Sequence, residues 1–348
     1  MTKIFFAGDT FSTFIKDDIK LLSEDYDITT LETPLKILDM PKYLIRCLMN
    51  VINIKNSNIV WIWFADIPAV PLILISKIFN IPTVVNVGGF EVSGIKEINY
   101  GNQLKPIRGW ISRWIIRNVT EIIVPSPEYY IKTLKVGIGI KLIDNTFALP
   151  DPEDDYYFEN YYLTHTMAHI SVIPNFIDTR TCDVPLPLKQ NIAVTAVCSK
   201  FAYDYKGIPT FLESSIFLPI GGTKILEHLP RKEYEENLKH AKVYCQLSRD
   251  ETFGISLVEA MAYGCVPVVS DKGALPWVVE DTGIIVPYGD VRATARGIET
   301  AMRMDGSKAR ERARYFSRER KQEAVRKLIN EIITPNMNSS IPSEPFEV

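Results

Sequence analysis

The first half of the chain alternates apolar runs with longer amphipathic segments. The apolar runs occupy residues 3–9, 58–65, 82–91 and 120–126. Runs that are apolar on both sides are typical of strands buried in a parallel sheet, and the segments between them are long enough for crossover helices. A short strand at 26–32 and another within 170–179 extend the pattern. We therefore predict an α/β domain of right-handed βαβ units over residues 1–180.

A second series of the same kind follows a proline-rich stretch at 183–191, which we interpret as an interdomain linker. The strands predicted in it are 192–200, 243–248, 265–271 and 283–289, with at most a short strand at 224–226. Residues 190–318 are therefore predicted to form a second α/β domain. The fold class that follows is α/β, with two Rossmann-like domains built on parallel sheets.

Three segments depart from this alternation. Residues 144–168 are acidic and rich in tyrosine, and they lack α/β periodicity, so we interpret them as an insertion in the first domain. Residues 307–332 predict one long, strongly charged helix. The polar tail at 334–348 is expected to be disordered.

Composition narrows the class of protein. The chain has 348 residues, of which 46% are hydrophobic and 23% charged, and its net charge is −3. These values fit a globular protein of two domains and give no basic field for nucleic acid. The five cysteines lack CxxC spacing, which argues against a zinc site or a disulfide framework and fits a reducing compartment. The first apolar run is too short for a signal peptide, so we expect a cytoplasmic location.

The longest apolar stretch, residues 59–79, approaches the length of a membrane span. Charged residues and prolines interrupt it at positions 66, 68, 71 and 77. We therefore favour a buried strand followed by a buried helix over a membrane span.

The stretch with the clearest chemistry is ETFGISLVEAMAYGCVPVVSD, residues 251–271. It should leave the carboxyl end of a strand and start a helix near Ile255, and ligands of open parallel sheets bind at that edge. The free N–H groups of Phe253, Gly254 and Ile255, together with the helix dipole, are candidates to hold a diphosphate. Gly254 lets an oxygen approach the main chain closely.

Glu251 and Glu259 would lie on either side of such a diphosphate, because one helical turn rises about 5.4 Å. A nucleotide sugar has that shape, and carboxylates accept hydrogen bonds from the hydroxyls at both of its ends. Lys200 and Lys206 leave the end of another strand of the same domain, where two cations would neutralise the diphosphate. The structural alternatives are a glutamate that complements the dipole, a solvated glutamate and two solvated lysines.

Two further constellations have both a functional and a structural interpretation. Gly8 and Asp9 follow the first strand and could line the cleft, or they form a plain strand-to-helix turn. The helix predicted at 105–118 carries Trp110 and Trp114 four residues apart, as are Arg113 and Arg117. That composition suits peripheral contact with an anionic membrane, at the inner membrane face, or else a docked amphipathic helix with solvated arginines. The histidines of HTMAH (165–169) lack the glutamate of a zincin, so no metal site is predicted there or elsewhere.

The stretch 251–271 resembles the E-x7-E signature of family 4 retaining glycosyltransferases, which have the GT-B fold. VIPNFID (172–178) resembles the entry into their C-terminal domain, and SKFAYDYKG resembles their basic donor loop. GGFEVSGIKEINYG and KPIRGWISRWIIRN resemble an N-terminal region of some members. The resemblance covers about 80–140 and 170–330, and its specific part is the E-x7-E region with the strand after it.

The resemblance implies two domains facing across a cleft, with a helix at 319–333 that crosses back to the first. Glu259 would bind the ribose, Glu251 the transferred sugar, and Lys200 and Lys206 the diphosphate. Such enzymes retain anomeric configuration, need no metal and have no firmly assigned nucleophile. This chain departs from the pattern at four places: Lys200 where arginine is usual, Gly88-Gly89 where a histidine often stands, Pro276-Trp277 in place of Pro-Glu, and a segment 207–243 that is shorter than usual. Glu91 is then the nearest polar side chain for acceptor or sugar contact.

These observations predict a retaining, metal-independent glycosyltransferase of the hexosyltransferase class. Its co-substrate would be a nucleotide-diphosphate sugar, no other cofactor is expected, and its acceptor would be a glycan, a lipid-linked molecule or a small molecule, as in polysaccharide or glycolipid synthesis. A GT-B epimerase or phosphorylase, or a non-catalytic relative, is the alternative. A dinucleotide oxidoreductase would need a G-x-G-x-x-G turn, which FAGDTF does not provide.

Overall fold

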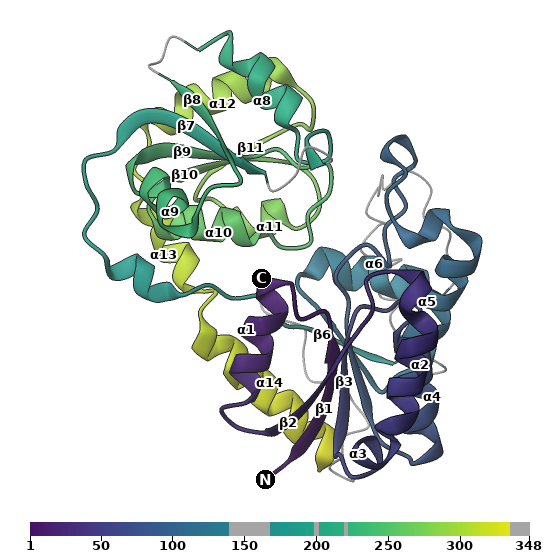
Figure 1. The fold of residues 1–348 in the computed structure, drawn as a ribbon. Helices are drawn as coiled ribbons and strands as arrows, with labels where there is room; N and C mark the ends of the chain where they lie inside the picture. Colours follow the sequence, from purple (N-terminus) through teal and green to yellow (C-terminus); the bar gives the residue numbers. More distant parts are fainter. Residues whose placement is uncertain (139–167, 198–201, 219–221, 335–348) are drawn as a thin grey trace, which may run out of the picture.

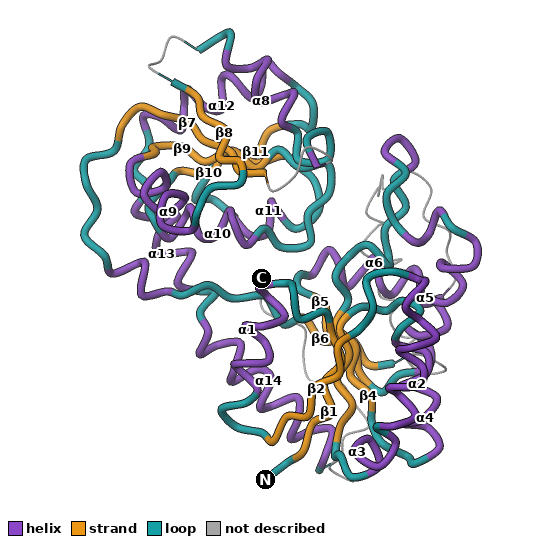
Figure 2. Tube along the Cα trace, in the orientation of Figure 1, coloured by secondary structure: helices purple, strands orange, loops and turns teal. Residues whose placement is uncertain are grey.

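Two parallel α/β domains make up the chain in the computed structural model, which describes residues 1–138, 168–197, 202–218 and 222–334 (Figure 1). In each domain helices cover both faces of a sheet (Figure 2). Most of the predicted insertion at 144–168 lies outside the described residues, as do Lys200 and the tail after residue 334.

The first domain is built on a six-stranded sheet. Its strands are β1 (Lys3–Gly8), β2 (Asp27–Glu32), β3 (Ile59–Trp63), β4 (Thr83–Asn86), β5 (Glu121–Val124) and β6 (His169–Val172). Their order is β2-β1-β3-β4-β5-β6, and every neighbouring pair is parallel. Along β1, Ile4 and Phe6 enter one core cluster while Phe5 and Ala7 enter another, since side chains of a strand alternate between the two faces.

Helices connect these strands on both faces. They are α1 (Thr13–Leu22), α2 (Met40–Met49), α3 (Val51–Lys55), α4 (Ala69–Ile78), α5 (Pro106–Asn118) and α6 (Pro127–Ile138), with the short 3-10 helices η1 (Ile37–Asp39), η2 (Lys96–Ile98) and η3 (Asn102–Leu104). The stretch 59–79 forms the fully buried β3 and then α4, as its interruptions predict. Within the described ranges no helix is both long and apolar enough to cross a bilayer.

The second domain has a five-stranded parallel sheet in the order β11-β10-β9-β7-β8. Its strands are β7 (Gln190–Val197), β8 (Thr223–Glu227), β9 (Ala241–Gln246), β10 (Val266–Ser270) and β11 (Ile284–Val286). Its helices are α8 (Ile208–Ser215), α9 (Arg231–His240), α10 (Ile255–Ala262), α11 (Leu275–Val279), α12 (Val291–Arg303) and α13 (Ser307–Arg314), and η4 (Thr179–Asp183) lies in the connection from the first domain. The edge strand β8 pairs along five residues, so the sequence underestimated it.

The prediction of one helix over 307–332 was wrong, because the chain breaks between α13 and α14 (Arg318–Ile333). At the break, the ring of Phe316 packs 5.0 Å from that of Phe253 in the second domain. The hydroxyl of Ser317 then accepts a hydrogen bond from the amide of Arg320 and caps the new helix. The break lets the chain leave one core and enter the other.

Helix α14 packs on the first domain, beside α1 (Figure 1). Val325, Leu328 and Ile329 are buried in the core cluster that also contains residues of β1 and β3. The Nζ of Lys321 lies 2.6 Å from Oδ1 of Asp18 on α1, and both side chains are buried. The last helix therefore ties the two domains together.

Both sheets reverse their winding next to their first strand. In the second domain this reversal lies between β7 and β9. Ligands of doubly wound sheets bind at such a switch point, outside the carboxyl ends of the strands. The loops that leave β7 and β9 are those that carry Lys206 and Glu251.

Candidate active site

The turn between β9 and α10 is held in an unusual backbone conformation. Gly254 has φ of +91°, a value that side chains disfavour, and it immediately precedes the first turn of α10. The carbonyl of Glu251 accepts a 2.8 Å hydrogen bond from the amide of Ala274. A Cβ at Gly273 would lie 2.4 Å from that carbonyl oxygen, so glycine is required for this close contact. The backbone of Glu251 is thus fixed from both sides.

The carboxylate of Glu251 is the acceptor for three side chains. Its Oε2 receives the ammonium of Lys206 at 2.5 Å, the amide of Gln246 at 2.9 Å and the hydroxyl of Ser248 at 3.2 Å. Gln246 and Ser248 come from the end of β9, whereas Lys206 comes from the loop after β7. The switch point therefore unites two of the residues that the sequence singled out.

The loop that carries Lys206 is attached to the loop after β9. The amide of Arg249 donates to the carbonyl of Tyr205 over 2.8 Å. Gly207 has φ of +68°, and a Cβ there would lie 2.0 Å from the carbonyl oxygen of Leu247. A residue with a side chain at position 207 would push the two loops apart and move Lys206 from Glu251. Lys200, the other predicted cation, lies outside the described residues.

The first amides of α10 form the third part of the site. Among the described residues, the N–H groups of Phe253, Gly254 and Ile255 donate to no acceptor. Free amides at a helix start attract phosphate oxygens. The side chain of Phe253 faces the other way, into the core, and its exposure is 0%.

Glu259 lies on α10 within this site, but it has a partner that the sequence did not reveal. Its Oε1 is 2.6 Å from the guanidinium of Arg231, the first residue of α9, and Arg231 also binds Glu235 at 2.6 Å. Burial raises the pKa of Glu259, and the charge of Arg231 opposes the rise. Nothing in the local sequence links positions 231 and 259, since only the neighbouring placement of α9 and α10 joins them.

On the first domain, Gly88 and Gly89 serve close packing. A Cβ at Gly88 would lie 2.4 Å from the ring of Phe64, which itself has φ of +76°. Gly89 has φ of +109°, and a Cβ there would lie 2.2 Å from Cγ2 of Thr252 in the second domain. Gly88 therefore allows close packing within the first domain, and Gly89 lets the two domains touch next to Glu251.

Glu91 does not have the exposed position that its proposed acceptor role assumes. Its exposure is 1%, and its Oε1 accepts hydrogen bonds from the amides of Ala65 and Gly88, both at 3.1 Å. Burial raises the pKa of Glu91. The carboxylate holds the backbone of the cleft loop in place. Glu91 therefore has a supporting role here, in place of the direct contact with a sugar or an acceptor that the sequence suggested.

Asp9 adopts the structural alternative. Its two carboxylate oxygens accept the amide of Phe11 and the hydroxyl of Ser12, each at 2.8 Å. These bonds form the turn that precedes α1. Gly8 ends β1 against the side chains of Ile15 and Phe6. Both residues lie at the edge of the first sheet that faces the cleft, but the bonds of Asp9 are local.

A buried charged cluster joins the domains immediately beside Glu251. Oδ1 of Asp250 lies 2.6 Å from Nζ of Lys132 on α6, and Oδ2 accepts the hydroxyls of Tyr129 at 2.8 Å and Ser93 at 3.1 Å. Asp250 is 1% exposed and Lys132 2% exposed. Sequence reasoning missed these residues, because more than a hundred positions separate Asp250 from its partners.

The helix predicted at 105–118 exists as α5, and two of its arginines make hydrogen bonds within the first domain. Arg113 donates to the side chain of Gln103, and Arg117 donates to the carbonyl of Gly137. Trp110 is 61% exposed, whereas Trp114 is partly buried. Of the four residues that suggested membrane contact, Trp110 and Arg117 are exposed, whereas Arg113 and Trp114 are partly buried.

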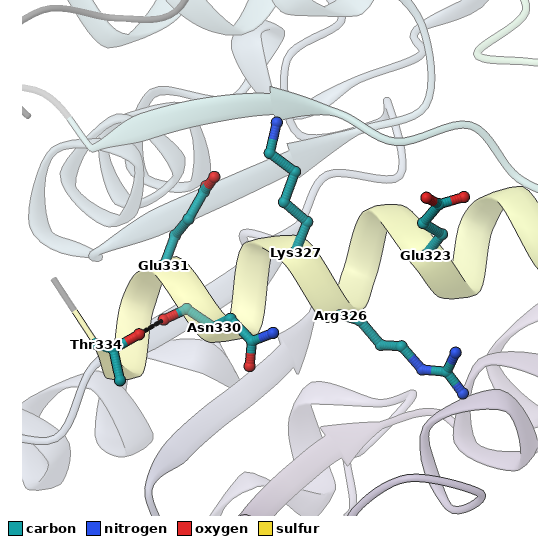
Figure 3. A pocket seen from close by; sticks show the side chains of 6 residues that line it. All are labelled: Glu323, Arg326, Lys327, Asn330, Glu331 and Thr334. Atoms are coloured by element: carbon teal, nitrogen blue, oxygen red, sulfur yellow. Dashed lines mark hydrogen bonds between the residues drawn. The ribbon is translucent and has the colours of Figure 1, made fainter. Parts of the chain in front are cut away.

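Other candidate sites add little. No group of three or more potential metal ligands occurs among the described residues. His169 binds Glu121, and His165 lies outside the described part. A hollow of about 430 Å³ runs along α14, lined by side chains of that helix and Thr334 just after it (Figure 3). None of the predicted site residues lines it.

Comparison with known proteins agrees with this geometry. Residues 218–320 match the family model for glycosyl transferases group 1. No curated protein matches the chain by sequence. The match covers the segment with α9, Glu251 and α10, so the enzyme class is glycosyltransferase.

The solved structures define the fold. Sucrose-phosphate synthase from Thermosynechococcus elongatus is similar with a TM-score of 0.67 and 13% identity, over 97% of this chain and 100% of that one. HepE from Anabaena, in complex with UDP-glucose, is similar with a TM-score of 0.69 and 12% identity, over 95% of this chain and 100% of that one. A glycosyltransferase from Rickettsia africae is similar with a TM-score of 0.65 and 14% identity, over 97% of this chain and 99% of that one. The chain has the GT-B fold over nearly its whole length.

Proposed function

We propose that this enzyme transfers a hexose from a nucleotide-diphosphate sugar to a hydroxyl of its acceptor, with retention of configuration and without a divalent metal. The observation that carries the proposal is the cluster at the switch point, where Lys206 meets Glu251 beside the free amides of α10. Anabaena HepE, which is similar in fold, was solved with UDP-glucose.

In this proposal the diphosphate lies at the start of α10. The amides of Gly254 and Ile255 and the ammonium of Lys206 stabilise the negative charge that develops on the leaving phosphate. Lys200 adds a second cation. Glu251 positions the hydroxyls of the transferred sugar, and Glu259 binds the ribose while Arg231 limits its rotation.

The chemical step breaks the bond between the anomeric carbon and the phosphate oxygen, whose electron pair stays with the nucleoside diphosphate. The acceptor oxygen bonds to the same face of the anomeric carbon, and its proton passes to the leaving phosphate. The side chains named here bind and orient, and none of them forms a covalent intermediate. The electrostatic contribution is expected to dominate the rate.

A thermal-shift series with UDP, GDP, ADP and their sugar conjugates tests the donor site. Binding raises the melting temperature by mass action, and one nucleotide should stabilise the wild type equally with and without EDTA. Lys206→Ala and Glu259→Ala should each weaken that binding about tenfold to a hundredfold, since each removes a charged hydrogen bond of about 1.5–3 kcal/mol. Lys224→Ala is the matched control, because Lys224 is exposed and its ammonium bonds to Asn237 on α9, away from Glu251 and Glu259.

Two results would contradict the proposal. Full transfer activity of Lys206→Ala or Glu259→Ala would remove these residues from the donor site. A shift that disappears with EDTA would refute metal independence. Retention is read separately, from the anomeric proton coupling of the product.

A further inference from the structure

Exposed apolar side chains gather on one face of the first domain. On η1, α2 and the start of α3, six apolar side chains are 59–85% exposed: Ile37, Leu38, Ile45, Leu48, Met49 and Ile52. On α2 itself only Tyr43 and Cys47 are buried, one turn apart. An amphipathic helix would place polar residues on its outer side, whereas the outer side of α2 is largely apolar. Contiguous exposed apolar surface of this kind marks an interaction site.

An apolar groove opens in the same face. It has a volume of about 420 Å³ and lies between α2, α4 and α5, which stand side by side (Figure 1). Its walls include Met40 and Leu44 of α2, Val70 and Pro71 of α4, and Trp110 and Trp114 of α5. Because α4 starts where β3 ends, the groove lies toward the carboxyl edge of the sheet, the edge that also carries the cleft loops.

The charges around this face are mostly positive. Residues 35–52 contain three basic residues, Lys36, Lys42 and Arg46, and one acidic residue, Asp39. Their net charge is therefore +2. Lys36, Lys42 and Arg46 are exposed, and none of them makes an ion pair within the described ranges. The remainder of the chain is acidic, since the net charge of the whole is −3.

We propose that this face, formed by η1, α2, the start of α3 and the exposed part of α5, docks on an anionic lipid bilayer, and that the groove takes one lipid hydrocarbon chain. Apolar side chains enter the boundary between headgroups and acyl chains, while lysine and arginine bind the anionic headgroups. A second copy fits less well, because a two-fold contact would bring the basic residues of both copies together. This inference does not depend on the donor chemistry.

Co-sedimentation of the full chain with vesicles tests the docking. Vesicles of phosphatidylcholine with about a third of phosphatidylglycerol should bind the protein, with less binding at high salt and much less to phosphatidylcholine alone. Leu48→Ser combined with Met49→Ser should lower the partition constant at least tenfold. Lys42→Gln and Arg46→Gln should each lower it about fivefold, in the salt-dependent part only.

The matched control is Leu188→Ser combined with Ile216→Ser. These side chains are 92% and 80% exposed but belong to the linker and the second domain, so vesicle binding should not change. All these positions are exposed, and the variants should keep their melting temperature. The nucleotide-dependent thermal shift should also remain, which separates failure of docking from failure of the donor site.

The groove has its own readout. Vesicles with brominated acyl chains should quench the fluorescence of wild-type protein, and Trp110→Phe should remove a large part of the quenching. Absence of vesicle binding, or an equal loss in the Leu188→Ser/Ile216→Ser control, would overturn the proposal. So would a dimer in lipid-free solution that the Leu48→Ser/Met49→Ser pair converts to monomers, because the face would then be an interface between copies.

Discussion

The buried ion pair between Asp250 and Lys132 gives the sharpest prediction about how the two domains are held. Its atoms are 2.6 Å apart, and both side chains are almost fully buried at the domain boundary. Lys132→Met keeps much of the side-chain volume and removes the charge. It removes the ammonium beside Asp250 and keeps the hydrogen bonds from the hydroxyls of Tyr129 and Ser93.

Removing one partner of a buried pair costs about 3–5 kcal/mol, because the other charge stays in a medium of low dielectric. We expect the lower part of that range, since two hydroxyls still donate to Asp250. Asp250→Asn in the same chain removes the remaining charge. The double variant should therefore lose much less than the sum of the two single losses, with a coupling of about 1–3 kcal/mol.

Urea unfolding followed by circular dichroism and tryptophan fluorescence measures these values. Four of the five tryptophans lie in the first domain and Trp277 in the second, so the two probes report whether the domains separate before they unfold. The exposed control, Lys224→Met, should change stability by less than about 0.5 kcal/mol. If Lys132→Met lowers the free energy of unfolding by less than about 1 kcal/mol, and the effects in the double-mutant cycle are additive, then water reaches the pair and the pair does not hold the domains together.

Two further predictions concern the cleft and the first sheet. Gly89→Ala should lower the free energy of unfolding by about 1–3 kcal/mol more than Gly289→Ala, because both glycines have positive φ but only a Cβ at Gly89 would also clash with Thr252. Thr252→Ser should recover part of the difference. Equal losses for the two glycine variants would refute the close contact. The hydrogen bond that the His169 ring donates to the Glu121 carboxylate raises the pKa of His169. An NMR titration should therefore give a pKa above the usual value of about 6.5, and Glu121→Gln should lower it. Because the folded-state pKa of His169 is raised, the pair stabilises the fold at pH values below the unfolded-state pKa of His169. This stabilisation is lost as the pH rises through the folded-state pKa. Burial also raises the pKa of Glu121, which limits the stabilisation at acidic pH. A pKa of His169 that does not respond to Glu121→Gln would contradict this account.

Much of the architecture follows from the sequence alone. Runs that are apolar on both faces, such as β3 and β10, can only be buried strands, and the helical segments between them require a parallel sheet. The neighbourhood of Lys206 and Glu251 was predictable for the same reason, since carboxyl ends of adjacent parallel strands meet at one edge. Gly254 could be recognised because it precedes a predicted helix start at the carboxyl edge of the sheet, and its φ in the structure is +91°.

Other features depend on contacts between distant parts of the chain. Sequence reasoning did not single out Asp250 or Arg231, because their partners, Lys132 and Glu259, become neighbours only when the domains and helices pack. Helical periodicity runs on through residues 307–332, yet the path from one core to the other breaks it at Ser317. The apolar outer side of α2 is decided by packing, which buries only Tyr43 and Cys47 of that helix.

Local patterns determine which segments become strands and helices, because periodicity and backbone preference act over a few residues. Contacts between distant segments decide other features: the charge pairing across domains, the burial of Glu91 and the exposure of α2. The energies of those contacts cannot be derived from a short stretch of sequence. For this protein, the sequence determined two parallel α/β domains and the strand ends at which Lys206 and Glu251 meet. The tertiary structure decided which buried groups join the domains beside Glu251 and which face of the molecule is left apolar.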